Sequence, residues 1–252
     1  MSIELVEHIN ENDAKLINFP KIDGENAGIL HEFLVEEEGN NVADNVFNNA
    51  IKALPYFVNP SFNSDNNVLS KILAIGRVQS GKTSFFISAI AFAFDNGYEI
   101  AYLVGGTKNT LRDQNYDRVQ AYFQNNEKVK IFDVNEVSEE KISALLSCNY
   151  KLVIVSLKNS ADNANLGKVA KLAKYFSEVP SLLVDDEGDE YSPGAPKLFD
   201  KTGRIGANHD LIKEAIYSLN HCTYLSVTAT PQANFLINTF DAISPDFAVL
   251  VN

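Results

Sequence analysis

Cysteine is scarce in this 252-residue sequence, which holds only Cys148 and Cys222. Two cysteines exclude a disulfide scaffold and a cysteine-based zinc site, and they are typical of proteins in a reducing compartment. Long apolar runs are also missing, because stretches such as Phe85–Phe94 fall well short of the roughly 18 to 20 residues that a membrane span needs. The first residues lack the basic and apolar segments of a signal peptide. We therefore expect a cytoplasmic protein without a membrane partner.

Basic residues are outnumbered, with 21 Lys and Arg against 33 Asp and Glu, so the formal net charge is −12. Such a balance argues against a general attraction to nucleic acid or anionic membranes. The charge is uneven, however: residues 1–70 hold 12 acidic and 3 basic side chains, whereas residues 71–252 hold 21 and 18. The acidic excess therefore belongs mainly to the first quarter of the chain and does not exclude a nucleic-acid site in the remainder.

Residues 1–70 are predicted to form an acidic, mainly helical extension. Their apolar residues have the spacing of two short amphipathic helices. These residues are Ile29, Leu30, Phe33 and Leu34 in the first helix, and Val46, Phe47, Ile51 and Leu54 in the second. The extension is either an adaptor packed on the main domain or a separate protein-binding module.

From residue 71 onward, short apolar runs alternate with helical stretches. The runs are continuous rather than alternating, as in strands covered on both faces. The expected strands are residues 72–75, 100–104, 129–134, 152–157, 181–184, 224–227 and 247–251, and the expected helices are residues 83–94, 110–124, 138–147, 166–178 and 209–219. This order predicts an α/β fold in three layers, with a mostly parallel sheet between helices.

The most specific motif is G-x-x-x-x-G-K-[ST], a nucleotide-binding phosphate loop. It lies between an expected strand and an expected helix, as that motif requires. Its glycines let backbone N–H groups surround a phosphate, while the following helix adds its positive end. The residues are Gly76, Arg77, Val78, Gln79, Ser80, Gly81, Lys82 and Thr83, followed by Ser84. We expect Lys82 to reach the β and γ phosphates of ATP and Thr83 to ligate Mg²⁺.

Acidic residues end the expected strand at residues 181–184. A run of carboxylates is usually a solvated surface, but this one follows a buried strand at the sheet edge that carries ligands in such folds. We expect Asp186 to hold the metal and Glu187 to orient and deprotonate the attacking water. The four histidines, His8, His31, His209 and His221, show no ligand spacing, so Mg²⁺ is the only metal implied.

Several motifs together resemble the first RecA-like lobe of superfamily 2 helicases. Residues 186–189 read D-E-G-D, similar to the D-E-A-D box with glycine in place of alanine, and residues 228–230 read T-A-T, similar to the S-A-T motif. Residues 105–114, G-G-T-K-N-T-L-R-D-Q, resemble motif Ia. With T-A-T-P-Q-A-N-F-L-I from residue 228, the set is most similar to the Z-one domain ATPases of bacterial restriction and phage-defence systems. This resemblance covers residues 70–252.

The resemblance implies an ATPase acting on nucleic acid, DNA rather than RNA, with other defence proteins as partners. Thr228 and Thr230 would couple the nucleotide state to movement of a second lobe. The residues that would face the nucleic-acid backbone are Thr107, Lys108, Arg112, Lys158 and Asn159. A cation at a strand end is also commonly just solvated, so that alternative stays open.

The sequence departs from the helicase pattern in three places. No glutamine precedes Gln79, so the usual adenine-reading residue is missing. The Gly- and Pro-rich segment 191–208 is long for a compact domain and indicates a lid, a partner-binding loop or disorder. No Q-x-x-G-R-x-x-R motif supplies arginine fingers, which predicts that residues 71–252 are one motor lobe of a longer protein and that the fragment binds Mg·ATP but barely hydrolyses it.

Two other functions remain open at this point. The phosphate loop is compatible with a kinase of a small molecule, which would need its own acceptor pocket and lid arginines. The chain could also be a nucleotide-gated interaction module, with the acidic residues 1–70 binding the partner.

Overall fold

The computed structural model describes residues 15–64, 66–76, 81–106, 109–160, 164–188, 207–230 and 243–251. The predicted segment 191–208 lies almost entirely outside these residues, as do Arg77, Val78, Gln79 and Ser80 of the phosphate loop and Thr107 and Lys108 of the predicted nucleic-acid contact.

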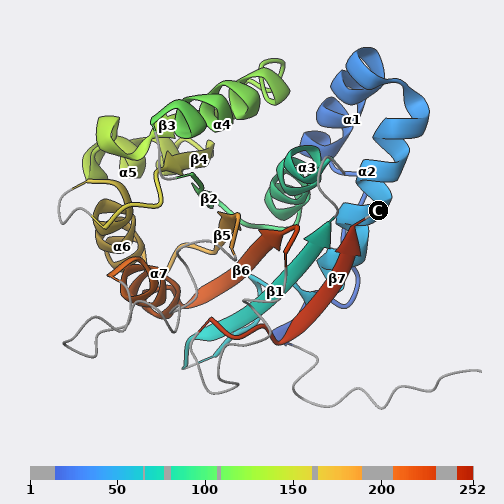
Figure 1. Cartoon of the computed structure of the whole chain (residues 1–252). Helices are drawn as coiled ribbons and strands as arrows, with labels where there is room; N and C mark the ends of the chain where they lie inside the picture. The colour runs from blue at the N-terminus through green and yellow to red at the C-terminus, as the bar shows by residue number, and fades with distance from the viewer. Residues whose placement is uncertain are drawn as a thin grey trace, which may run out of the picture.

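The described strands form one parallel sheet of seven strands in the order β3-β4-β2-β5-β6-β1-β7. Their bounds are β1 Val68–Gly76, β2 Ile100–Val104, β3 Val129–Asp133, β4 Lys151–Ser156, β5 Ser181–Asp186, β6 His221–Thr228 and β7 Phe247–Val251. β6 lies between β1, which leads into the phosphate loop, and β5, which ends in the carboxylates (Figure 1). The carboxyl ends of these strands therefore meet at one edge of the sheet.

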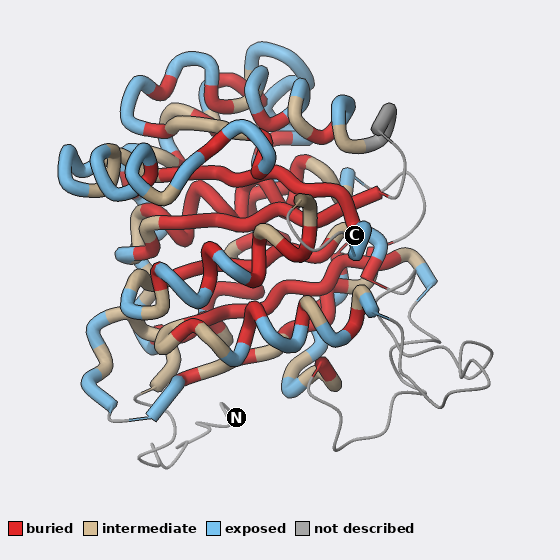
Figure 2. The backbone as a smooth tube through the Cα atoms, turned by 90° about the vertical axis from the view of Figure 1, so that its left-hand side faces the viewer, coloured by how far each residue is buried: buried red, intermediate tan, exposed pale blue. Residues whose placement is uncertain are grey.

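Seven α-helices in the described part of the chain cover the two faces of the sheet. They are α1 Glu25–Glu38, α2 Asn40–Ala53, α3 Lys82–Asp95, α4 Asn109–Tyr122, α5 Glu139–Ser147, α6 Asn165–Tyr175 and α7 Ala207–Ser218, with short 3₁₀ helices η2 Leu54–Tyr56 and η3 Val134–Glu136. One apolar core contains residues of helices α1, α2, α3 and α4 and of one face of the sheet. A second core contains residues of α5, α6 and α7 and of the other face. Figure 1 shows α1–α3 and α5–α7 on opposite sides of the strands, and Figure 2 shows the strands as mainly buried backbone.

Alternate residues of each strand face the two cores, as the pleat of a strand requires. On β2, Ala101 and Leu103 belong to the first core, whereas Ile100, Tyr102 and Val104 belong to the second. This burial on both faces explains the continuous apolar runs in the sequence. The predicted α/β three-layer fold, with all seven expected strands and all five expected helices after residue 71, is confirmed.

The helices α1 and α2 cover α3, which is buried continuously from Ser84 to Phe94. A helix that is apolar all round must be covered on every side, and the sheet covers only one. Asp95 at the end of α3 also accepts main-chain N–H bonds from Asn26 (3.1 Å) and Ala27 (2.8 Å), in the first turn of α1. The two predicted helices of the extension are therefore part of the layer that contains α3, and β1 begins inside the extension, at Val68.

None of the described helices has the length and apolar character that crossing a bilayer requires.

Candidate nucleotide site

A pocket of about 160 Å³ opens at the carboxyl edge of the sheet. Residues from four segments line it: Lys82 and Thr83 of α3, Gly106 after β2, Gln114, Asn115 and Arg118 of α4, and Asp186 and Glu187 at the end of β5. The four residues predicted to bind phosphate, bind the metal and activate water thus line a single pocket, although more than 100 positions separate Lys82 from Asp186 in the sequence.

The first turn of α3 supplies the phosphate side of the pocket. Gly81 precedes the helix with φ of +73°, a left-handed conformation that suits glycine because it has no Cβ. Its carbonyl oxygen accepts the N–H bond of Phe85 at 2.9 Å, so the helix begins directly after Gly81, and the first N–H groups of a helix have no acceptor within it. Lys82 and Thr83 occupy this turn, where the helix dipole favours an anion.

The end of β5 supplies the acidic side. Burial raises the pKa of Asp186; a hydrogen bond from Asn115 Nδ2 (3.4 Å) and the positive charges of Lys158 and Lys82 oppose that rise. The side chain of Glu187, in contrast, is exposed at the pocket. A partly buried carboxylate near two lysines is a suitable ligand for a hard cation, and an exposed carboxylate can meet water.

The neighbouring Asp185 faces away from the pocket because successive residues of a strand point to opposite faces. Its carboxylate is fully buried, lies 2.6 Å from Lys158 Nζ and accepts a hydrogen bond from the hydroxyl of Tyr224 at 2.7 Å. Lys158 was expected to contact nucleic acid, but the side chain is 1% exposed. We therefore do not retain it as a nucleic-acid contact.

Helix α4 contributes pocket residues that the sequence analysis missed. Arg118 Nη1 donates to Thr83 Oγ1 at 3.2 Å, and one turn further the hydroxyl of Tyr122 lies 2.7 Å from Ser84 Oγ. Gln114, Arg118 and Tyr122 recur every four residues, so they share one face of the helix. That spacing was present in the sequence, but a polar helix face ordinarily indicates solvent.

The end of β6 lies next to the acidic strand end. Asp186 is paired in register with Val227, and Thr228 follows, fully buried. The N–H of Thr230 donates to Thr228 Oγ1 at 2.9 Å, which closes a tight turn at the strand end. The two threonines predicted to couple the nucleotide state to motion thus adjoin the strand that carries Asp186.

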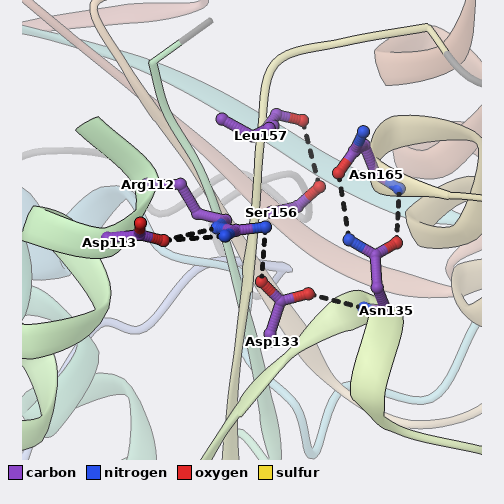
Figure 3. A network of polar contacts seen from close by, with 7 residues as sticks. All are labelled: Arg112, Asp113, Asp133, Asn135, Ser156, Leu157 and Asn165. Carbon is purple, nitrogen blue, oxygen red and sulfur yellow. Dashed lines mark hydrogen bonds and ion pairs between the residues drawn. The ribbon is translucent and has the colours of Figure 1, made fainter. Parts of the chain in front are cut away.

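Arg112 lies in a polar network with Asp113 and Asp133 rather than facing solvent alone (Figure 3). Its guanidinium donates to Asp113 at 2.7 and 2.9 Å and lies 3.1 Å from Asp133 Oδ2, and the hydrogen bond to Asp113 raises the pKa of Arg112. Asp133 also accepts a hydrogen bond from the N–H of Asn135. Asn135 and Asn165 exchange two further hydrogen bonds. Asn159, which follows β4 and was also predicted to contact nucleic acid, is exposed.

The donor atoms of the pocket suit Mg²⁺. They are the hydroxyl of Thr83 and the carboxylates of Asp186 and Glu187, all oxygen ligands of the kind that Mg²⁺ prefers. Across the residues that the structure describes, no group of three His, Cys, Asp or Glu could hold a metal unaided.

No protein-family model matches the chain, and no curated protein sequence matches it. Among solved structures it is similar to the DUF1998 helicase MrfA bound to DNA, with a TM-score of 0.51 and 14% identity over 95% of this chain and 31% of that one. For the structure of MrfA bound to DNA and AMPPNP, the TM-score is 0.51 and the identity is 15%, over 95% of this chain and 30% of that one. For RecG bound to a three-way DNA junction, the TM-score is 0.42 and the identity is 16%, over 82% of this chain and 22% of that one. The chain therefore shares a fold with part of MrfA, of which it spans less than a third.

Proposed function

We propose that this chain is an ATP-binding and ATP-hydrolysing motor lobe of a superfamily 2 helicase or translocase that acts on DNA. The observation that carries the proposal is the single pocket that gathers Lys82, Thr83, Asp186 and Glu187. The MrfA structures support it further, because a helicase with a similar fold binds DNA and AMPPNP.

Each pocket residue has a task in this proposal. Lys82 and the N–H groups at the start of α3 bind the phosphates, while Thr83 and Asp186 hold Mg²⁺. The bound metal would neutralise charge on the phosphates. Glu187 orients the attacking water and accepts its proton at the carboxylate. Phosphoryl transfer consists mainly of positioning and charge stabilisation, so these groups form most of the local machinery.

DNA contacts belong to the same proposal. Thr107, Lys108, Arg112 and Asn159 would contact the backbone, and Thr228 and Thr230 would transmit the nucleotide state to a second RecA-like lobe. Residues 1–70 would serve as an extension of the motor lobe formed by residues 71–252. The resemblance to Z-one domain ATPases suggests a place in bacterial restriction or phage defence, in the cytoplasm and with other defence proteins.

Titration of the 252-residue chain with a fluorescent ATP analogue and Mg²⁺ tests the site. Lys82→Ala should weaken binding by at least about tenfold, since a charge-assisted hydrogen bond contributes about 1.5–3 kcal/mol. Lys174→Ala, which removes an exposed lysine of α6 away from the pocket, is the matched control. Equal affinities for wild type and Lys82→Ala would contradict the proposal.

The motor activity is tested in the full-length protein. DNA should stimulate its ATPase, and Glu187→Gln should retain ATP binding while hydrolysis stops. An ATPase that DNA leaves unchanged would favour the kinase or the interaction module instead.

A further inference from the structure

Lys158 has its whole side chain inside the protein. Its Nζ lies 2.6 Å from Asp185 Oδ1 and donates to the main-chain carbonyl oxygens of Asp186 (2.9 Å) and Glu187 (2.8 Å). An ammonium group has three N–H donors, and these acceptors engage all three. Two of the three belong to residues that line the nucleotide pocket.

Stability alone does not account for this arrangement. A buried ion pair is commonly no more stabilising than an apolar pair of similar volume, because both charges lose their water. The pair is nevertheless fixed from several sides: Tyr224 donates to Asp185, the N–H of Lys158 donates to the carbonyl of Gly106 at 2.8 Å, and Asn208 Nδ2 donates to the carbonyl of Lys158 at 3.1 Å. The main chain of Lys158 is thus held by two other segments, and the carboxylate that pairs with its ammonium group is held by β6.

The turn that Lys158 contacts is conformationally unusual. Glu187 has φ of +57°, a left-handed conformation that is unfavourable for a non-glycine residue. The following N–H, of Gly188, donates to the carbonyl of Val227 on β6 at 3.0 Å. Lys158 on one side and β6 on the other therefore fix the peptide groups that flank Glu187, and these decide where its side chain points.

We propose that Lys158 is a positioning residue for hydrolysis: its ammonium group holds the carbonyls of Asp186 and Glu187 so that the Glu187 carboxylate faces the pocket. This inference rests on the proposed function of the pocket. Lys158 acts through Glu187 and not by contact with nucleotide or DNA. Its removal should accordingly affect the rate of hydrolysis and leave nucleotide affinity almost unchanged.

The test variant is the double substitution Lys158→Met with Asp185→Asn, because Lys158→Met alone leaves a buried carboxylate without its cation. The amide oxygen that the second substitution introduces would still accept the hydrogen bond of Tyr224. Lys158→Arg is the conservative variant, whose planar guanidinium keeps the ion pair but matches the two carbonyls less well. Lys151→Met is the matched control, because Lys151 is a half-buried lysine at the start of β4, the strand that Lys158 follows.

Three measurements separate positioning from folding. In the nucleotide-free chain, hydrogen exchange of the Gly188 amide should be at least about tenfold faster in the double variant. The dissociation constant for Mg·ATP should stay within about threefold of wild type, and single-turnover hydrolysis by the full-length protein should fall about 100-fold, within the range for loss of a positioned base. Lys158→Arg should give an intermediate hydrolysis rate, and Lys151→Met should match wild type in all three.

Wild-type hydrolysis in the double variant would overturn the inference, as would equal losses of affinity and rate. Should the double variant not fold, Lys158→Arg decides, since a wild-type rate in that variant would overturn the inference equally. Failure of the proposed function looks different, because the wild-type chain itself would then not bind Mg·ATP. Gly188 exchange needs no nucleotide, so an unchanged exchange rate would refute the role of Lys158 in that case too.

Discussion

The guanidinium of Arg118 donates a hydrogen bond from Nη1 to Oγ1 of Thr83 at 3.2 Å, so an arginine of α4 contacts the hydroxyl proposed to bind the metal. Both residues line the pocket together with Lys82. The pocket therefore holds two cations on its phosphate side, one from the phosphate-loop motif and one from a helix that the motif does not include.

We predict that Arg118→Ala weakens Mg·ATP binding by about tenfold, because a charge-assisted hydrogen bond to phosphate contributes about 1.5 kcal/mol or more. Titration with a fluorescent ATP analogue measures the change. Gln120→Ala, at a nearby exposed position of the same helix that does not line the pocket, should bind like wild type. Tighter binding by Arg118→Ala would instead mean that Arg118 competes with the metal for Thr83.

Asp186 should reduce the stability of the nucleotide-free protein. Burial raises its pKa, so the folded state holds the proton more tightly than the unfolded state. The destabilisation is absent below the ordinary aspartate pKa of about 3.9 and is complete once the pH exceeds the raised value in the folded state. Asp186→Asn should therefore raise the melting temperature at neutral pH but not at acidic pH, while Mg²⁺-dependent nucleotide binding is lost. A lower melting temperature at neutral pH would contradict the assignment.

Lys82 and Lys158 show how far the site could be predicted from the sequence. Lys82 was identified because the motif that explains it is contiguous in the chain. The acceptors of Lys158 lie on residues 185 to 187, and only the packing of β4, β2 and β5 brings them together. A lysine at a strand end ordinarily indicates a solvated charge, so the local pattern favoured the wrong environment.

Neither the order of the strands in the sheet nor the contact of α4 with the pocket could be predicted from the sequence. The strands could be located because each is a short apolar run, but the position of β6 beside β1 depends on a pairing across more than 100 residues, such as that of Val68 with His221. Gln114 and Arg118 occupy a polar helix face, and the sequence does not indicate that this face meets the first turn of α3.

Asp95 should stabilise the contact between α1 and α3. The N-cap of α1, Gly24, makes no side-chain capping bond, and Asp95 of α3 instead accepts the N–H bonds of Asn26 and Ala27. We expect Asp95→Ala to lower the free energy of unfolding by about 1–2 kcal/mol, the usual effect of losing a helix cap. Urea denaturation measures it, with Glu32→Ala on the exposed face of α1 as control. A stability equal to that of the control would show that the capping bonds do not matter.

Gly188 and Ser226 offer a physical reason for the glycine that replaces alanine in the D-E-A-D-like motif. A Cβ at residue 188 would overlap the hydroxyl of Ser226 on β6, and Gly188 is buried. Gly188→Ala should therefore destabilise the fold by about 1–3 kcal/mol, as overpacking in a core does.

The double variant Gly188→Ala with Ser226→Gly removes the obstructing side chain and should recover most of that loss. Because the turn also carries Glu187, hydrolysis should fall in the single variant and return in the double one. Ser226→Gly alone is the control for the substitution on β6, and urea denaturation of all three variants, with single-turnover hydrolysis beside it, measures the coupling between the two positions. Additive effects on stability would show that the hydroxyl of Ser226 is not what excludes alanine from this motif.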